Sequence, residues 1–271
     1  MKKKWKALLI VCGVVAGVGL SMCIAGVSMG ATLSDVDVDI PFYERRTDDQ
    51  KAEERNGKKF LQEFDSIERI KLDAGVLKIQ LLSVPEKEQK IQIKGETILK
   101  EKGLELEKQG DTLFVKCKDK KNLKGLKGHS LDIYIPETKK LKEVEAKAGV
   151  GEIVADTIRA EKCSMSVGVG DVKVNYFETE QLELSCGTGD IKMKDGTIGE
   201  SIKVKCGAGD IELGLDGTEN DYDYELKTGM GDLAIEGMEK VEGIAGKRFI
   251  DNEADKLIRI DCGVGDVTVS F

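Results

Sequence analysis

From Phe60 onward, apolar and polar residues alternate along the chain, which is the pattern of half-buried β-strands. The clearest period-two segments are bounded by Gly, Asp or Pro, and they read IERIKLDAGVLKIQLLSV, QKIQIKGE, DTLFVKCK and SLDIYIP. No convincing amphipathic helix interrupts them. Residues 60–271 are therefore predicted to form an all-β domain.

The second half of the chain repeats a strand, a G-x-G-D or G-x-G-E turn and a second strand. The first glycines of the six copies are spaced by 19, 19, 20, 22 and 34 residues, and they are Gly149, Gly168, Gly187, Gly207, Gly229 and Gly263. The long last step contains an insertion, roughly Gly237 to Asp255, and LDAGVLKIQ around Gly75 is a degenerate earlier copy. A period of about 20 residues predicts a single β-solenoid, whose coils are two or more short strands joined by tight arcs.

An uncharged apolar stretch precedes the strands, from Ala7 to Ala31. At about 1.5 Å per residue, this stretch is long enough to cross the hydrocarbon layer as one transmembrane helix. Four lysines lie before it, which places the N-terminus in the cytoplasm. The expected single-pass membrane protein has a cytoplasmic tip (1–6), an anchor helix (7–31), a charged juxtamembrane linker (32–59) and an extracytoplasmic solenoid (60–271).

Two other interpretations of the N-terminal segment remain open. A cleaved signal peptide would have a similar charged start, and Ser28-Met29-Gly30 is an acceptable cleavage site, although the apolar run is longer than a usual signal core. A lipoprotein would use Cys23, but Met22 before it fits that motif poorly. An uncleaved anchor is the preferred prediction.

The net charge argues against nucleic acid as a partner. Without the four N-terminal lysines, the chain holds 38 Lys and Arg against 50 Asp and Glu, a net charge of −12. Affinity for nucleic acid comes mostly from Lys and Arg that neutralise phosphates. The aromatic content of 5% also indicates a thin core of Val, Ile and Leu rather than a bulky globular core.

The turns carry a column of acidic residues, which are Glu152, Asp171, Asp190, Asp210, Asp232 and Asp266. In stacked coils, these carboxylates would lie about 4.8 Å apart. They could form a calcium ladder, but the preferred interpretation is that each carboxylate hydrogen-bonds the backbone of its own turn and faces water. The sequence therefore predicts no metal site and no cofactor.

The position before the first glycine of each turn is predicted to be a small, inward-facing core position. It holds Ala74, Ala148, Val167, Cys186, Cys206, Thr228 and Cys262. The external part contains five cysteines, which cannot all pair internally, and no C-x-x-C motif indicates zinc. Mostly buried free thiols are expected.

A lysine-rich segment stands out against the acidic background, with Lys116, Lys118, Lys120, Lys121, Lys124 and Lys127. It could contact an anionic polymer, but a solvated hairpin loop is the simpler interpretation, and His129 at its end is expected on the surface. With a single His and no nucleophile motif, no catalytic residue is predicted. The alternative enzyme is a polysaccharide-active β-helix that relies on carboxylate pairs.

The lysine-led apolar start, LDIYIPETKKLKEVEAKAGVGEIVA and the serial G-x-G-D strands together resemble the LiaG-like putative adhesin domain of Gram-positive envelope proteins. The resemblance covers roughly residues 60–271. It implies a β-solenoid at the cell envelope and brings no catalytic residues. The function expected is a non-catalytic adhesion or interaction platform, whose partner is an envelope polymer or protein. The alternative function is an accessory subunit of an envelope-stress or signalling system.

Overall fold

The computed structural model describes residues 59–85, 90–101, 103–117, 129–239 and 246–271. The chain divides into two units, Met1–Arg55 and Asn56–Phe271, and every described residue belongs to the second. The predicted tip, anchor and linker therefore lie outside the described residues, apart from Lys59. Within the described ranges, no helix is both long and apolar enough to span a bilayer.

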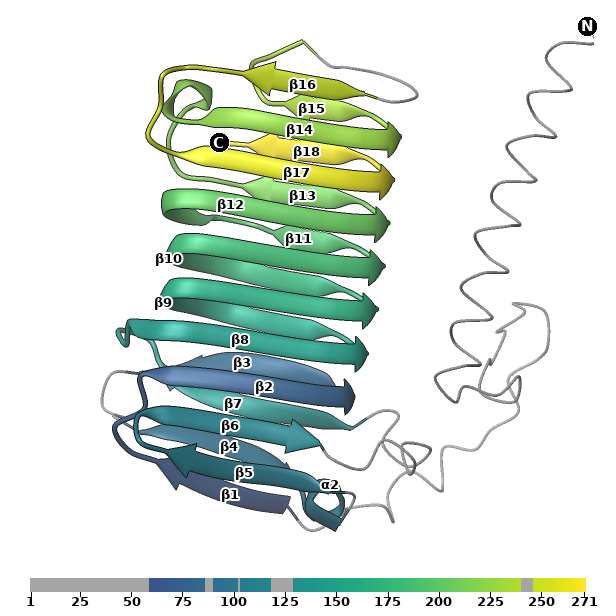
Figure 1. Ribbon diagram of the computed structural model, residues 1–271. Coiled ribbons are helices and arrows are strands. Elements are labelled where there is room, and N and C mark those ends of the chain that lie inside the picture. The colour runs from purple at the N-terminus through teal and green to yellow at the C-terminus, as the bar shows by residue number, and fades with distance from the viewer. Residues whose placement is uncertain (1–58, 86–89, 102, 118–128, 240–245) are drawn as a thin grey trace, which may run out of the picture. The chain divides into compact units, whose positions relative to one another are not determined.

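The second unit is a stack of β-coils with two long faces (Figure 1). Along the first face the strands follow the order β5 (Leu104–Gln109), β6 (Thr112–Cys117), β2 (Arg69–Val76), β8 (Leu141–Val150), β9 (Ile153–Val169), β10 (Val172–Thr188), β12 (Gly196–Ala208), β17 (Leu257–Val264), β14 (Asp223–Met230) and β16 (Lys247–Ile250). Strands β9, β10 and β12 contribute their C-terminal halves to this face.

Along the second face the order is β1 (Lys59–Phe64), β4 (Ile91–Glu96), β7 (Ser130–Pro136), β3 (Lys78–Val84), the first halves of β9 and β10, β11 (Ile191–Met193), β13 (Ile211–Gly214), β18 (Val267–Ser270) and β15 (Leu233–Ile235). The pairs β1–β4, β4–β7, β5–β6 and β14–β16 are antiparallel, and the other pairs of the two faces are parallel. Antiparallel strands thus end the first face at both ends, and a parallel ladder fills the middle.

The apolar residues of the alternating pattern point inward, as predicted, and form columns through the stack. One column runs through register partners on the second face, and its members are at most 1% exposed: Ile79, Ile153, Val172, Ile191, Ile211, Val267 and Leu233. Aliphatic side chains of similar volume pack closely against one another when they repeat at the spacing between strands. The all-β solenoid and its aliphatic core are therefore confirmed.

The coils do not stack in the order of the sequence. The last coil, β17 and β18, lies between the coil of β12 and β13 and the coil of β14 and β15 (Figure 1). At the other end, β2 and β3 lie between β6 and β7 on one side and β8 and β9 on the other. The insertion after Gly237 has a structural role, since it carries β16, which pairs with β14 before the chain returns.

Two local expectations were wrong. Strands β9 and β10 each run for 17 residues from one face to the other, so those coils have one sharp turn instead of several. A break remains between β11 and β12, at Lys194 and Asp195. The structure also contains a five-residue helix α2 (Thr97–Glu101), which begins directly after β4 and buries Leu99, and a 3-10 turn (Glu219–Asp221).

Candidate interaction surface

The G-x-G-D turns all lie along one edge of the stack, which we call the G-x-G-D edge (Figure 1). Its glycines are required because adjacent turns approach closely. A Cβ on Gly168 would lie 2.5 Å from the carbonyl oxygen of Gly149 in the next coil. Gly170 has a φ of +127°, and a Cβ there would overlap the carbonyl oxygen of Gly151. The edge is therefore a tightly packed backbone surface.

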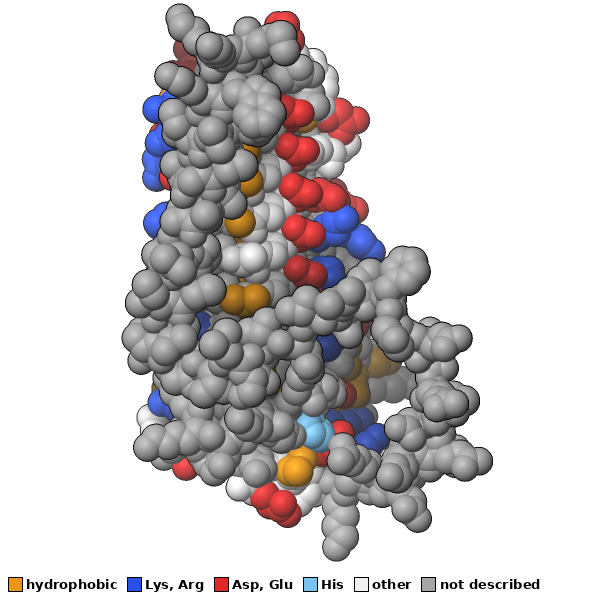
Figure 2. All heavy atoms as spheres, turned by 90° about the vertical axis from the view of Figure 1, so that its right-hand side faces the viewer, with side chains coloured by type: hydrophobic (Ala, Val, Ile, Leu, Met, Phe, Trp, Pro, Cys, Tyr) orange, Lys and Arg blue, Asp and Glu red, His pale blue; other side chains and the backbone are white. Residues whose placement is uncertain are grey.

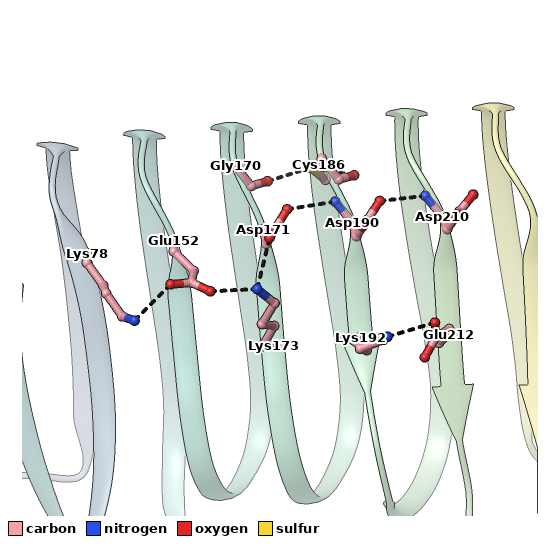
Figure 3. Close-up of polar contacts among 11 residues, drawn as sticks. Lys78, Glu152, Gly170, Asp171, Lys173, Cys186, Asp190, Lys192, Asp210 and Glu212 are labelled. Carbon is pink, nitrogen blue, oxygen red and sulfur yellow. Dashed lines mark hydrogen bonds and ion pairs between the residues drawn. The ribbon is translucent and has the colours of Figure 1, made fainter. Parts of the chain in front are cut away.

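The acidic residues of the turns form a hydrogen-bonded ladder across coils (Figure 3). Oδ1 of Asp171 accepts the backbone N–H of Asp190 at 3.0 Å, and Oδ1 of Asp190 accepts that of Asp210 at 2.9 Å. The ladder continues from Asp210 to Asp266 and from Asp266 to Asp232, each at 2.9 Å. The expectation that each carboxylate bonds its own turn was wrong, because the next coil's N–H lies within reach at the strand spacing.

Lysines bridge the first carboxylates of the ladder (Figure 3). Lys173 Nζ lies 2.8 Å from Glu152 Oε1 and 2.9 Å from Asp171 Oδ2, while Lys78 Nζ lies 2.9 Å from Glu152 Oε2. The hydrogen bond from Lys173 holds the pKa of Glu152 below its ordinary value. The N–H of Asp190 and then Lys173 lower the pKa of Asp171, and these carboxylates raise the pKa of Lys173. This part of the ladder is internally neutralised.

Beside the carboxylates, the edge displays a column of mostly apolar side chains, which are the x residues of the G-x-G-D turns and Val76 of the degenerate copy. In stacking order, the column contains Val76, Val150, Val169, Thr188, Ala208, Val264 and Met230. Val150, Val169 and Val264 are each at least 50% exposed, and Met230 is 38% exposed. Figure 2 shows this apolar column next to a row of acidic side chains.

The opposite border of the apolar column belongs to the first face and differs in charge. Its outward residues, in register, are Asp73, Lys147, Ser166, Ser185, Lys205, Asp261 and Lys227. Three of these seven residues are lysines, whereas the ladder side is acidic at each of its six levels. The apolar column thus separates a mixed, lysine-bearing border from an acidic one.

Three cysteines, Cys186, Cys206 and Cys262, occupy the predicted core position. Ala74, Ala148, Val167, Cys186, Cys206, Cys262 and Thr228 are register partners in that order, and none is more than 5% exposed. Cys163, Cys186, Cys206 and Cys262 are buried free thiols, and Cys117 is buried as well. Burial raises the pKa of Cys163 to about 12. The column supports the turns from inside, since Cys186 Sγ lies 3.1 Å from Gly170 O.

The lysine-rich segment lies largely outside the described residues, which include only Lys116 at its start. Lys116 Nζ sits 4.9 Å from the ring centre of Phe114. His129 was expected on the surface, but its side chain is 22% exposed and its Nδ1 lies 3.1 Å from Glu96 Oε2. The side chain is thus partly covered, because residues 129 and 96 meet where β7 and β4 pair.

Metal-ligand geometry does not occur in the described part of the chain, where no three His, Cys, Asp or Glu side chains converge on one point. The spare oxygens of the ladder lie along a line rather than around a centre, because each carboxylate belongs to a different coil. The arrangement can therefore present a row of negative charge and hydrogen-bond acceptors to a partner.

A family comparison agrees with the repeat. Residues 140–270 match the Toastrack DUF4097 family model. The Toastrack match contains all six copies of the turn, from Gly149 to Asp266. The coils before Lys140 extend the same stack beyond the match. No curated protein matches the chain.

Solved structures similar to the chain include proteins described as adhesins. A "putative cell adhesion protein" from Clostridium sporogenes is 14% identical over 79% of this chain and 98% of that one, with a TM-score of 0.38. A "putative adhesin" from Bacteroides fragilis is 14% identical over 79% and 97%, with a TM-score of 0.37. A "putative adhesin" from Parabacteroides merdae is 16% identical over 79% and 97%, with a TM-score of 0.30. Likeness at these scores assigns no ligand to this chain.

Proposed function

We propose that the chain is a non-catalytic interaction platform at the cell envelope, which contacts its partner through the G-x-G-D edge. The observation that carries this proposal is the exposed apolar column, Val150, Val169, Val264 and Met230, beside the carboxylate ladder. Exposed aliphatic side chains aligned over several coils mark a surface that gains free energy when another molecule covers it.

The frame behind the edge favours recognition without rearrangement. Each turn is held by backbone hydrogen bonds to the next, such as Gly170 N to Thr188 O at 2.9 Å, and by the carboxylate ladder. A surface whose backbone is already held by hydrogen bonds loses little conformational entropy when it binds. The edge is thus pre-organised along the length of the parallel stack.

Placement at the envelope is part of the proposal and rests on the sequence. Residues 7–31 are uncharged and long enough for an anchor helix, and Lys2, Lys3, Lys4 and Lys6 favour a cytoplasmic N-terminus. Residues 32–59 would then act as the linker and residues 60–271 would lie outside the cell. The LiaG-like resemblance supports a Gram-positive envelope, with an envelope polymer or protein as partner.

The chemistry of the reactive groups supports a non-catalytic role. His129, the only histidine of the chain, lies against Glu96. The thiols of Cys163, Cys186, Cys206 and Cys262 are buried, and a buried thiol is a poor nucleophile. The aspartates of the edge accept hydrogen bonds from backbone N–H groups of the neighbouring coil, which gives them a structural role.

The test is co-sedimentation of the full chain, held in lipid vesicles, with isolated cell walls and with isolated membranes. We expect saturable binding that is lost in the triple variant V150S/V169S/V264S. The matched control is L61S, since Leu61 on β1 is an exposed apolar residue of the second face, away from the edge. Equal binding by the triple variant and the wild type would reject the edge as the contact surface.

The same experiment separates the alternatives. Binding to membranes but not to walls, unaffected by the serine substitutions, would favour an accessory subunit that acts through residues 1–59. Release of reducing sugars from the walls would favour the polysaccharide enzyme. Loss of binding on calcium chelation would give the carboxylate ladder a metal-binding role.

A further inference from the structure

The two borders of the apolar column are complementary to each other at the same level of the stack. At one level Lys205 lies on the first-face side and Asp210 on the ladder side, and at another Lys227 lies opposite Asp232. Two further levels place a hydroxyl opposite a carboxylate, Ser166 with Asp171 and Ser185 with Asp190. The edge therefore carries both halves of a set of polar pairs.

Three levels contribute less to this complementarity. Lys147 contacts Glu145 within the chain, and Glu152 on the other border is bridged by Lys78 and Lys173. Asp261 lies at the level of Asp266, where two like charges would meet. Asp171 is likewise satisfied within its own chain, since its Oδ1 accepts the N–H of Asp190 and its Oδ2 contacts Lys173. Of the six levels, two are thus satisfied within the chain, one is unfavourable, and three place a lysine or a hydroxyl opposite a carboxylate.

This pattern selects one symmetry for self-association. A two-fold axis parallel to the stack, placed over the apolar column, brings the first-face border of one copy against the ladder border of the other at the same level. It also places each x residue against the same residue of the second copy. A two-fold axis across the stack would instead bring ladder against ladder, where like charges repel.

We propose that the G-x-G-D edge is the interface of a parallel, in-register dimer of this chain. The inference rests on the proposed function, because it names the partner of the same surface. Lys205 and Lys227 of each copy face Asp210 and Asp232 of the other, and the valines of the two columns pack against each other. Both copies then have β1 at the same end of the stack, as two chains anchored in one membrane require.

The size of the edge makes this dimer weak. Seven levels at about 4.8 Å span only about 30 Å, and the strip is three residues wide at each level, with one border residue on each side of the apolar column. Stable interfaces bury about 800 Å² per partner, so the dimer depends on local concentration. Confinement of both copies to one membrane raises that concentration without any further contact.

Cysteine cross-linking of the full chain in lipid vesicles tests the register. V150C and V264C are each expected to form a disulfide with the same residue of a second copy. A mixture of the two variants should form no V150C–V264C product, because four levels, about 19 Å, separate these positions. The controls are S164C, on the outer face of β9, and the chain without an added cysteine, which measures background from Cys12 and Cys23. A V150C–V264C product, or cross-linking no greater than in the controls, would overturn the proposal.

A charge reversal tests the polar pairs. K205E changes two pairs of a two-fold dimer, so we expect the dimer to weaken by about tenfold. The matched control is K203E, two residues earlier on β12, where Lys203 contacts Glu183 on the outer face. Equal effects of K205E and K203E would contradict the proposed pairing.

The experiments can reject either proposal without rejecting the other. Cross-linking at V150C without binding to walls or membranes would support the dimer and reject an envelope ligand. Binding that is lost in V150S/V169S/V264S, without a same-residue cross-link, would support the interaction platform and reject the dimer.

Discussion

Oδ1 of Asp210 accepts a hydrogen bond from the backbone N–H of Asp266 at 2.9 Å, although 56 residues separate the two in the chain. The contact exists because β17 and β18 lie next to β12 and β13, ahead of coils that precede them in the sequence. One hydrogen bond thus joins two features of the molecule, the carboxylate ladder and the out-of-sequence stacking of the last coil.

Removal of one rung should destabilise the stack moderately. In D190A the N–H of Asp210 loses its acceptor, so we expect the free energy of unfolding to fall by about 1–2 kcal/mol. Denaturant unfolding measures the change. D156A is the control, because Asp156 lies on the second face outside the ladder. An equal loss in the two variants would show that the rung contributes nothing of its own.

A glycine substitution separates crowding from backbone strain. In G170A the new Cβ overlaps the carbonyl oxygen of Gly151 at a positive φ, so we expect a loss of about 3 kcal/mol or more. Gly110 has a φ of +60° with no heavy atom within 4 Å of a Cβ, so G110A should cost only about 1 kcal/mol. Thermal unfolding of both variants compares them directly, and similar losses would reject the close approach of the turns.

The buried thiols should resist alkylation in the folded protein. Cys163 has a pKa raised to about 12, so its thiolate is scarce at neutral pH, and Cys262 is only 1% exposed. We expect Cys163, Cys186, Cys206 and Cys262 to react only after denaturation, as followed by mass spectrometry. V264C is the matched control, since position 264 is 50% exposed only two residues from Cys262. Rapid modification of Cys262 in the native protein would contradict the packing of its column.

Acid should weaken the part of the ladder bridged by Lys173. The folded pKa values of Glu152 and Asp171 lie below their ordinary values of 4.5 and 3.8. Their contribution to stability is therefore complete above those values and is lost as the pH falls through the lower folded values. Denaturant unfolding between about pH 2 and pH 7 should show this loss, and it should be smaller in K173M. K162M, at an exposed lysine of β9, should keep the wild-type profile, and an unchanged profile in K173M would contradict the bridge.

The C-terminal coil should exchange its amide hydrogens slowly. Strand β17 has paired neighbours on both sides, β12 and β14, whereas β16 pairs with β14 alone among the described strands. Hydrogen exchange measured by mass spectrometry should therefore find Leu257–Val264 protected more strongly than Lys247–Ile250. Fast exchange over β17, as at a frayed chain end, would contradict the inserted position.

The solenoid could be predicted because its signals are local. Alternation with a period of two identifies strands, and Gly149, Gly168 and the later glycines mark turns whose backbone excludes a Cβ. The core position of Cys186, Cys206 and Cys262 followed from the small residues that replace them in other copies. Each of these inferences needs only one coil and its neighbour.

The order of the coils and the partners of the carboxylates were decided by the tertiary structure. A spacing of about 20 residues is compatible with any stacking order, since every coil offers its neighbour the same edges. The long insertion allows β17 to return between β12 and β14, and only that return brings Asp210 to Asp266. Sequence therefore determined what each coil is, through periodicity and glycine sterics. Long-range pairing determined which coils meet, and hence which charges border the apolar column.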